Sequence, residues 1–202
     1  MARDEGRVTP LPADLNTRNL HLAKFSFADW RRIHLAPYGA CFYSPNPTNR
    51  FSSPGCPVLY VGDKVVTTFW ETFWDDLETV PEDRRILPEN KLKERRLCAV
   101  MSHREFLVFN STNAKALRAV SANAAAFDAD YAICQAWAVA LLNHPQKPEG
   151  ILYSSVRHNG GVCLGLFACR TDCPEMDFRD MGVLDAAPTV RALITKEHIG
   201  LL

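Results

Sequence analysis

The sequence lacks the compact motifs that mark several common enzyme classes. It contains no G-x-G-x-x-G fingerprint, no Walker A loop, no H-E-x-x-H, no G-x-S-x-G and no protein-kinase signature. These absences argue against Rossmann dehydrogenases, P-loop NTPases, zinc proteases, α/β-hydrolases and protein kinases. Any catalytic residues must therefore be dispersed along the chain.

The sequence also lacks net charge and long apolar runs. It carries 23 Lys and Arg against 23 Asp and Glu, so no overall field attracts nucleic acid or an anionic membrane. The longest apolar stretch, Trp137 to Leu142, is far shorter than the ~20 residues that cross a bilayer. The polar start, with Pro10 and Pro12, has no apolar segment of a secretory signal. We expect a soluble, cytoplasmic protein that neither spans a membrane nor binds nucleic acid directly.

The cysteines lack a recognisable spacing. Seven are scattered without a C-x-x-C pair, at positions 41, 56, 98, 134, 163, 169 and 173. An odd, irregular set argues against both a disulfide framework and a zinc site. The sequence predicts reduced, mostly buried thiols. His34, His103 and His158 show no metal-ligand spacing either, so we expect no metal.

The composition is that of a globular protein. The 202 residues are 47% hydrophobic, 10% aromatic and 23% charged, which suits a single folded core. Residues 1–24 show no clean period and are interpreted as a leader that packs on the domain or stays mobile. Residues 25–202 are expected to form one catalytic domain.

Periodicity predicts alternating strands and helices. Residues 25–53 contain Pro37, Pro45 and Pro47 and are expected to be loop-rich with short strands. Residues 78–95 are charged and predict a solvated connector, and the segment after residue 168 is expected to wrap the domain and end in a short strand. Strands are predicted at 57–62, 97–101, 106–109, 150–155 and 162–168, the last two as a hairpin, and helices at 65–77, 113–120 and 129–142.

One set of residues, dispersed along the sequence, is a candidate catalytic site. Arg50 opens a predicted strand, Tyr60 lies in that strand, and Glu71 lies on the predicted helix that follows. The apolar doublets of this helix would be buried, which leaves Thr67, Glu71 and Asp75 on the opposite side. Taken alone, Glu71 is more often a solvated surface carboxylate, an arginine more often a surface ion-pair partner, and a strand tyrosine more often part of the core.

Several segments share their order and separation with one known family. They are Arg32-Ile33-His34, Asn49-Arg50-Phe51-Ser52, Val58-Leu59-Tyr60-Val61 followed by Glu71-Thr72, Gly150-Ile151-Leu152-Tyr153-Ser154-Ser155-Val156-Arg157, and Val162 to Phe167. Together they resemble the RES domain, whose name records its Arg, Glu and Ser, from about residue 31 to residue 168. The family often has glycine where Asn49 stands and proline where Ser154 stands.

The resemblance implies a fold, a reaction and a partner. RES domains are similar to ADP-ribosyltransferases, so we expect an α+β fold with a small, split, mostly antiparallel sheet flanked by helices. Such proteins are typically bacterial toxins that consume NAD by hydrolysis or phosphorolysis, and some relatives transfer ADP-ribose to a protein. We expect no cofactor here, with NAD as the substrate and phosphate as a candidate co-substrate. The family also implies a helix-turn-helix (Xre-type) antitoxin as partner, and a possible homodimer.

Each candidate residue suits a step of that reaction. Glu71 would stabilise the positive charge that develops on the ribose as nicotinamide leaves. Arg50 and Arg32 would grip the pyrophosphate, with Arg31 as a competitor for Arg32. Tyr60 would stack on nicotinamide or donate its hydroxyl.

Ser155, with Ser154 as a competitor, would position Glu71 or the substrate amide by hydrogen bonding and would not act as a nucleophile. The residues leave open whether water or phosphate accepts the ADP-ribose. A mono-ADP-ribosyltransferase acting on a protein is one alternative. A catalytically inactive nucleotide-binding module is another.

Overall fold

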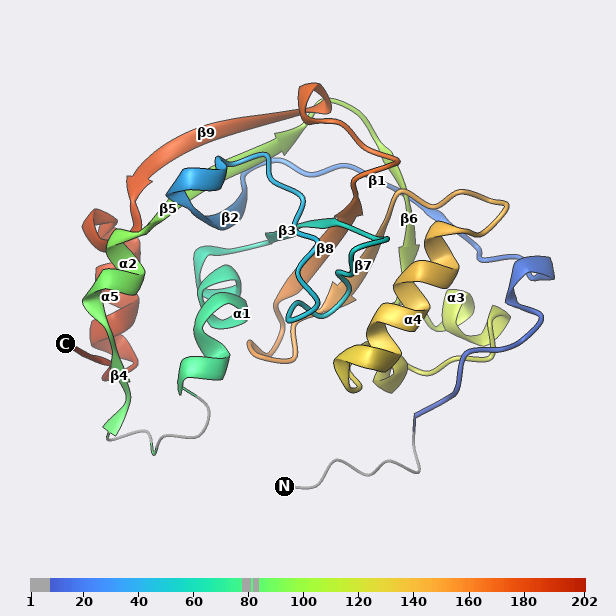
Figure 1. Ribbon diagram of the computed structural model, residues 1–202, viewed down its shortest axis with the longest axis horizontal. Coiled ribbons are helices and arrows are strands. Elements are labelled where there is room, and N and C mark those ends of the chain that lie inside the picture. Colours follow the sequence, from blue (N-terminus) through green and yellow to red (C-terminus); the bar gives the residue numbers. More distant parts are fainter. Residues whose placement is uncertain (1–7, 78–80, 82–83) are drawn as a thin grey trace.

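The computed structural model describes residues 8–77, 81 and 84–202, which form one curled eight-stranded sheet, a two-stranded sheet and five α-helices (Figure 1). The strand order of the large sheet is β1-β6-β7-β8-β3-β2-β5-β9, and of its described pairings only β6 with β7 is parallel. Its strands are β1 (Ala23–Phe25), β2 (Trp30–Leu35), β3 (Val58–Gly62), β5 (Arg95–Ser102), β6 (Phe106–Asn110), β7 (Gly150–Ser154), β8 (Val162–Phe167) and β9 (Met176–Val183).

The helices lie around this sheet, with the small sheet beside α5 (Figure 1). In the small sheet β10 (Gly200–Leu201) pairs with β4 (Ile86–Leu87). None of the helices in the described ranges is long and apolar enough to cross a membrane. The helices are α1 (Val65–Leu77), α2 (Glu89–Lys93), α3 (Ala114–Ala119), α4 (Tyr131–Leu142) and α5 (Pro188–Lys196).

The predicted α+β class, with a mostly antiparallel sheet flanked by helices, is confirmed. The predicted strands and helices between residues 57 and 168 are present, including the β7–β8 hairpin. The sheet is larger than expected because β9 was not predicted. β9 is an edge strand with mostly solvent-accessible side chains, so its sequence shows no apolar alternation. The predicted final short strand is β10, and α5 before it was missed.

The prediction that residues 78–95 form a solvated connector is wrong for its second half. Leu87 in β4 and Leu92 in α2 are completely buried, in the apolar cluster that includes α1 and α5. Short elements of two and five residues show too little periodicity to be recognised. Positions 78–80 and 82–83 of the connector lie outside the described residues.

The central strands have two buried faces with different partners. In β3, Val58 and Tyr60 belong to or pack against the cluster around α4, whereas Leu59 and Val61 belong to a cluster that includes Phe27. This alternation is the two-residue period of a strand. Both faces of β3 are covered by other residues, so a polar side chain on the face toward α4 can be enclosed within the protein.

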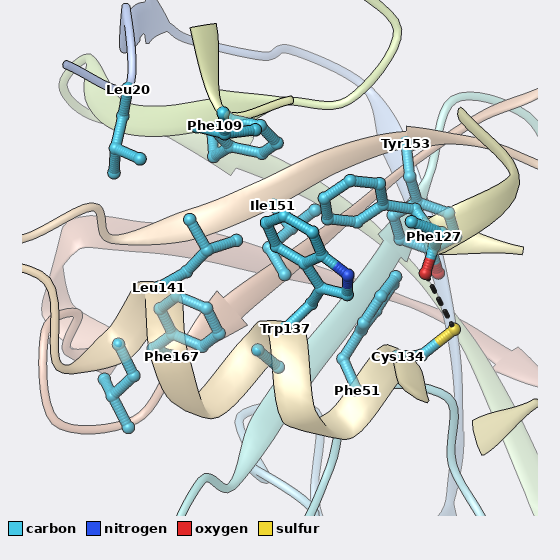
Figure 2. Packing of buried hydrophobic residues seen from close by; sticks show 14 of the residues in the cluster. Leu20, Phe51, Phe109, Phe127, Cys134, Trp137, Leu141, Ile151, Tyr153 and Phe167 are labelled. Atoms are coloured by element: carbon cyan, nitrogen blue, oxygen red, sulfur yellow. Dashed lines mark hydrogen bonds between the residues drawn. The ribbon is translucent and has the colours of Figure 1, made fainter. Parts of the chain in front are cut away.

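The core under α4 is built on aromatic residues (Figure 2). Trp137 is completely buried and contacts Phe127, with ring centroids 5.2 Å apart. Phe51 packs edge-on against Tyr153 of β7 at 4.9 Å. This packing fixes the chain just after Arg50 against the sheet.

The described part of the expected leader packs on the domain. Leu15 and Leu20 are buried in the cluster around α4. Leu20 N donates a hydrogen bond to Gln146 Oε1 at 2.7 Å, and His144 Nε2 lies 3.1 Å from Leu15 O. The first seven residues of the leader lie outside the described residues.

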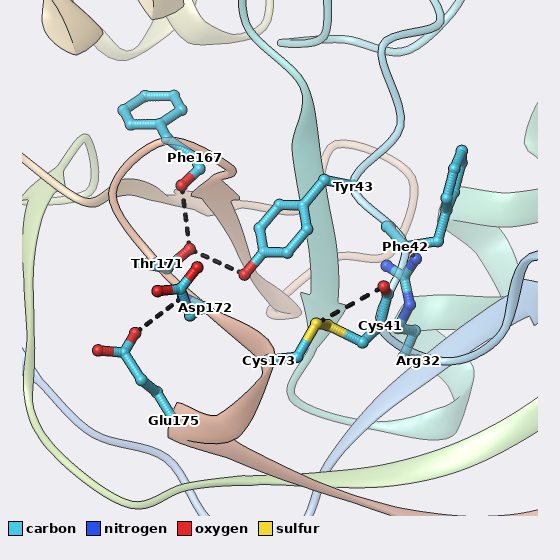
Figure 3. The surroundings of a disulfide bond; sticks show 9 residues. All are labelled: Arg32, Cys41, Phe42, Tyr43, Phe167, Thr171, Asp172, Cys173 and Glu175. Carbon is cyan, nitrogen blue, oxygen red and sulfur yellow. Dashed lines mark hydrogen bonds between the residues drawn. A yellow bond between two sulfur atoms is a disulfide. The ribbon is translucent and has the colours of Figure 1, made fainter.

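The prediction that all cysteines are reduced is wrong for one pair. Cys41 and Cys173 form a disulfide (Figure 3). The partners are 132 residues apart in sequence, and the fold brings their Cα atoms to 5.9 Å. No local spacing can reveal such a pair. The other five cysteines are thiols, of which Cys169 is exposed and the remaining four, at positions 56, 98, 134 and 163, are buried.

Removing the disulfide is expected to destabilise the protein. The double variant Cys41→Ser/Cys173→Ser should lose ~2–4 kcal/mol of unfolding free energy, because the cross-link restricts the unfolded chain across a long loop. Urea unfolding under non-reducing conditions measures this, with Cys169→Ser as the control. An unchanged midpoint, or seven titratable thiols in denatured wild type in place of five, would contradict the assignment.

Candidate functional site

A cavity of about 750 Å³ lies between α1 and the start of α4, over the strands β3, β7 and β8. Four of the five predicted site residues line it: Arg32, Arg50, Tyr60 and Glu71. The fifth, Ser155, is buried directly beside Glu71. Residues from widely separated segments of the sequence therefore converge on one pocket.

Helix α1 carries Glu71 into the cavity because the helix is amphipathic. Phe69, Phe73 and Leu77 are completely buried in the cluster with α5. Thr68 and Glu71, on another side of the helix, line the cavity. The side chain of Glu71 is 19% exposed, so the carboxylate is largely shielded but accessible to a ligand.

Ser155 holds Glu71 through a hydrogen bond of defined direction. Ser155 Oγ accepts bonds from the backbone N–H groups of Arg157 and His158, at 3.2 and 2.9 Å. Its single proton is donated to Glu71 Oε1 at 2.7 Å. Both lone pairs of the hydroxyl are engaged, which leaves none for nucleophilic attack. Ser154 is exposed, so Ser155 is the serine that contacts Glu71.

The loop after Ser155 is fastened to the first turn of α1. His158 Nδ1 lies 2.9 Å from Thr67 Oγ1, and Thr67 donates to Asp63 Oδ1 at 2.7 Å. Since the hydroxyl proton of Thr67 goes to Asp63, His158 Nδ1 must be the donor to Thr67. Gly161 permits this approach, because a Cβ there would lie 2.7 Å from the Thr67 side chain. These contacts hold Ser155 beside Glu71.

Arg50 lies opposite Glu71 in the lining of the cavity. Its side chain is 6% exposed, and its Cζ atom lies 5.7 Å from the Tyr153 ring centroid. Nη1 is 3.4 Å from both Phe127 O and Asp128 Oδ1, and Nη2 is 3.9 Å from Glu71 Oε2. Burial lowers the pKa of Arg50, but Tyr153, Glu71 and Asp128 outweigh it and raise the pKa overall. The 3.9 Å contact is too long for a hydrogen bond, so Nη2 can still donate to an anion.

Arg32 lines the cavity as a buried cation, whereas Arg31 is turned away from it. Arg32 donates from Nη1 to Tyr60 O at 2.9 Å and from Nη2 to Phe42 O at 2.7 Å. Burial lowers its pKa to about 10, so it stays charged at neutral pH. Arg31 Nη2 donates to Asp29 Oδ2 at 2.9 Å. Of the two, Arg32 is the arginine placed for a ligand in the cavity.

Tyr60 contributes to the cavity wall but uses its hydroxyl for structure. The hydroxyl accepts a hydrogen bond from Phe51 N at 2.9 Å and lies 2.9 Å from Ser52 Oγ. Burial raises the pKa of this phenol, so it remains neutral. The bond to Phe51 N anchors the residue next to Arg50. Tyr60 therefore fixes the backbone next to Arg50.

Sequence reasoning missed Tyr153, Cys163 and Asp128. Tyr153 lines the cavity beneath Arg50 and pairs with Cys163 across the hairpin. The two-residue strand period places Tyr153 on the same face as Ser155, a signal that could have found it. Nothing in the sequence around Asp128 indicates its contact with Arg50. Burial raises the pKa of the Cys163 thiol well above its usual range, so it is not a ready nucleophile.

Within the described ranges, no group of three or more His, Cys, Asp or Glu side chains is arranged to hold a metal ion. The cavity is instead lined by three carboxylates and four guanidinium groups, those of Glu71, Asp75, Asp76, Arg32, Arg50, Arg95 and Arg157. This combination suits a ligand that carries phosphates and a carbon centre that becomes cationic.

Known proteins share the fold of this chain. One solved structure similar to this chain is the crystal structure of the M. tuberculosis MbcT–MbcA toxin–antitoxin complex, matched with a TM-score of 0.67 and 19% sequence identity over 90% of this chain and 99% of that chain. At this identity the likeness shows a shared fold. No curated protein sequence matches significantly. The family model of the RES domain matches residues 18–184. The chain therefore belongs to the RES domain family.

Proposed function

We propose that this protein degrades NAD by cleaving the bond between nicotinamide and ribose. The observation that carries the proposal is the Glu71 carboxylate, bonded to Ser155 on one side and facing Arg50 on the other, inside a cavity of about 750 Å³. Cavities of roughly 300–1,000 Å³ are typical of small-molecule sites.

The chemistry requires stabilisation of a cationic sugar. As the glycosidic C–N bond breaks, its electron pair leaves with the nicotinamide nitrogen, which becomes neutral. The ribose carbon develops the charge of an oxocarbenium ion, and an adjacent carboxylate stabilises it. Water or phosphate then forms the new bond to that carbon and loses a proton. Of the carboxylates that line the cavity, Glu71 is the one that Ser155 holds by a hydrogen bond.

The other residues prepare this carboxylate and hold the substrate. Ser155 fixes the orientation of Glu71 with a charge-assisted hydrogen bond. Arg50 Nη2 and the guanidinium of Arg32 supply positive charge for the pyrophosphate. Tyr60 fixes the backbone next to Arg50 through its bond to Phe51 N. The substrate would lie with its nicotinamide ribose at Glu71 and its phosphates toward the arginines.

We further propose that the protein is the toxin of a toxin–antitoxin pair. The support is its RES domain and its likeness in fold to a structure described as a toxin–antitoxin complex. The proposed partner is a helix-turn-helix (Xre-type) antitoxin that covers the cavity. Loss of cellular NAD would be the toxic effect.

The test is incubation of the purified protein with NAD and chromatographic measurement of free nicotinamide, with and without phosphate. Release with ADP-ribose as co-product indicates hydrolysis, and ADP-ribose 1-phosphate indicates phosphorolysis. Nicotinamide release accompanied by ADP-ribose on a protein would reassign the enzyme as a transferase. Absence of release at high enzyme concentration would refute the proposal.

A further inference from the structure

An aromatic pair at the rim of the cavity takes no part in the chemistry described above. Tyr38 and Phe42 both line the cavity, and their rings stack with centroids 4.6 Å apart and planes inclined by 17°. Tyr38 is 57% exposed, an unusual position for a large aromatic ring with no core to fill. The pair therefore offers a flat apolar surface to a ligand in the cavity.

The backbone beneath this pair is fastened at three points. The disulfide joins Cys41 to Cys173, and the Tyr43 hydroxyl lies 2.9 Å from Thr171 Oγ1. Arg32 Nη2 donates to Phe42 O at 2.7 Å. In Figure 3 Tyr43 points toward Thr171, whereas the Phe42 ring points away from the disulfide. A surface held in place in this way loses little entropy when a ligand binds.

The sheet topology separates this pair from the Glu71–Ser155 end. Tyr38 follows β2, and Ser155 follows β7, three strand positions away in the order β7-β8-β3-β2. Three spacings of ~4.8 Å amount to ~14 Å across the sheet. At one end of these strands Ser154 pairs with Val162, and Gly62 at the end of β3 pairs with Arg31 near the start of β2. Tyr38 lies beyond the opposite end of β2. The two features occupy diagonally opposite corners of these four strands.

The charge between the two corners suits a diphosphate. Arg32 lies on β2 between Arg31 and the Tyr38 end, and its guanidinium bonds the carbonyls of both Tyr60 and Phe42. The cavity thus presents, in spatial order, a carboxylate, cationic side chains and an aromatic surface. A dinucleotide carries a reactive ribose, a pyrophosphate and a second base in the same order.

We infer that the Tyr38–Phe42 pair is the purine-binding end of the cavity and stacks on the adenine of NAD. This inference rests on the proposed NAD-cleaving function, with Glu71 at the nicotinamide end. Base–aromatic stacking is sensitive to loss of one ring, with ~5–100-fold weaker binding on substitution by alanine. The pair would favour a dinucleotide over a mononucleotide.

The test compares NAD with nicotinamide mononucleotide, which lacks the adenosine. Tyr38→Ala should raise KM for NAD about tenfold with little change in kcat, and should leave turnover of the mononucleotide as in wild type. Tyr38→Phe, which retains the ring, should behave as wild type, and Phe42→Leu should resemble Tyr38→Ala. Since Tyr38 is exposed, its replacement should leave the fold intact. Equal effects on both substrates, or none on NAD, would overturn the inference.

A binding measurement separates this inference from the proposed reaction. Calorimetric titration with AMP probes the purine site without any turnover. Weaker AMP binding by Tyr38→Ala, with binding retained by Tyr38→Phe, supports the aromatic site even if wild type releases no nicotinamide. Equal AMP affinity in wild type and Tyr38→Ala overturns it, whatever the enzyme does to NAD.

Discussion

Glu71→Gln is expected to reduce nicotinamide release by about 10³-fold while leaving the fold intact. In the wild-type protein Ser155 Oγ donates a hydrogen bond to Glu71 Oε1 at 2.7 Å. The amide of the variant has the same size as the carboxylate, and its oxygen still accepts this bond. It removes the negative charge that would stabilise the cationic ribose. The measurement is steady-state nicotinamide release from NAD, together with thermal unfolding to confirm the fold.

The matched control is Glu105→Gln. Glu105 is an exposed carboxylate that contacts Lys24 at 3.7 Å outside the cavity, so its neutralisation should not affect turnover. Turnover by Glu71→Gln within a few-fold of wild type would show that Glu71 is not the stabilising carboxylate. A matching loss in Glu105→Gln would point to a general effect of charge.

Arg50→Lys is expected to raise KM for NAD tenfold or more. The guanidinium reaches Asp128 through Nη1 and Glu71 through Nη2, and only a planar fork reaches both while donating to a phosphate. Lysine keeps the charge, so Glu71 retains a cation nearby, and kcat should fall less than the apparent affinity. Steady-state kinetics separate the two parameters.

Arg179→Lys provides the comparison for Arg50→Lys. Arg179 is 75% exposed on β9 and contacts Asp29, outside the cavity lining, so its replacement should leave KM as in wild type. An unaltered KM in Arg50→Lys would assign Arg50 a structural role in joining α1 to the segment around Asp128.

The sequence was sufficient for the elements that frame the site. The apolar doublets of residues 65–77 predicted a helix with Glu71 outside the core, and α1 occupies that range. The strand runs around Tyr60 and Tyr153 became β3 and β7. These elements are buried on defined faces, so apolar periodicity is strong in them. Edge strand β9, which covers little apolar surface, left no such signal.

Contacts between distant segments were not predictable from local pattern. The Cys41–Cys173 disulfide joins positions 132 residues apart. The contact of Arg50 with Asp128, 78 residues further along the chain, also depends on how loops return to the sheet. Tyr60 was predicted to stack on nicotinamide or to donate its hydroxyl, and it lines the cavity. The bonds of its hydroxyl to Phe51 N and Ser52 Oγ could not be read from local pattern, because only the fold supplies the partner of a buried phenol. The resemblance to the RES family, and no local pattern, pointed to the five site residues that the fold brings together at the cavity.

A crystal structure of the Glu71→Gln variant with intact NAD tests the central claim most directly. We expect the carbon that bears nicotinamide to lie against Ser155 and the substituted side chain at position 71. The pyrophosphate should face Arg50 and Arg32, and the adenine should stack at Tyr38. NAD bound with its nicotinamide ribose away from position 71, or at another surface with this cavity empty, would contradict the account.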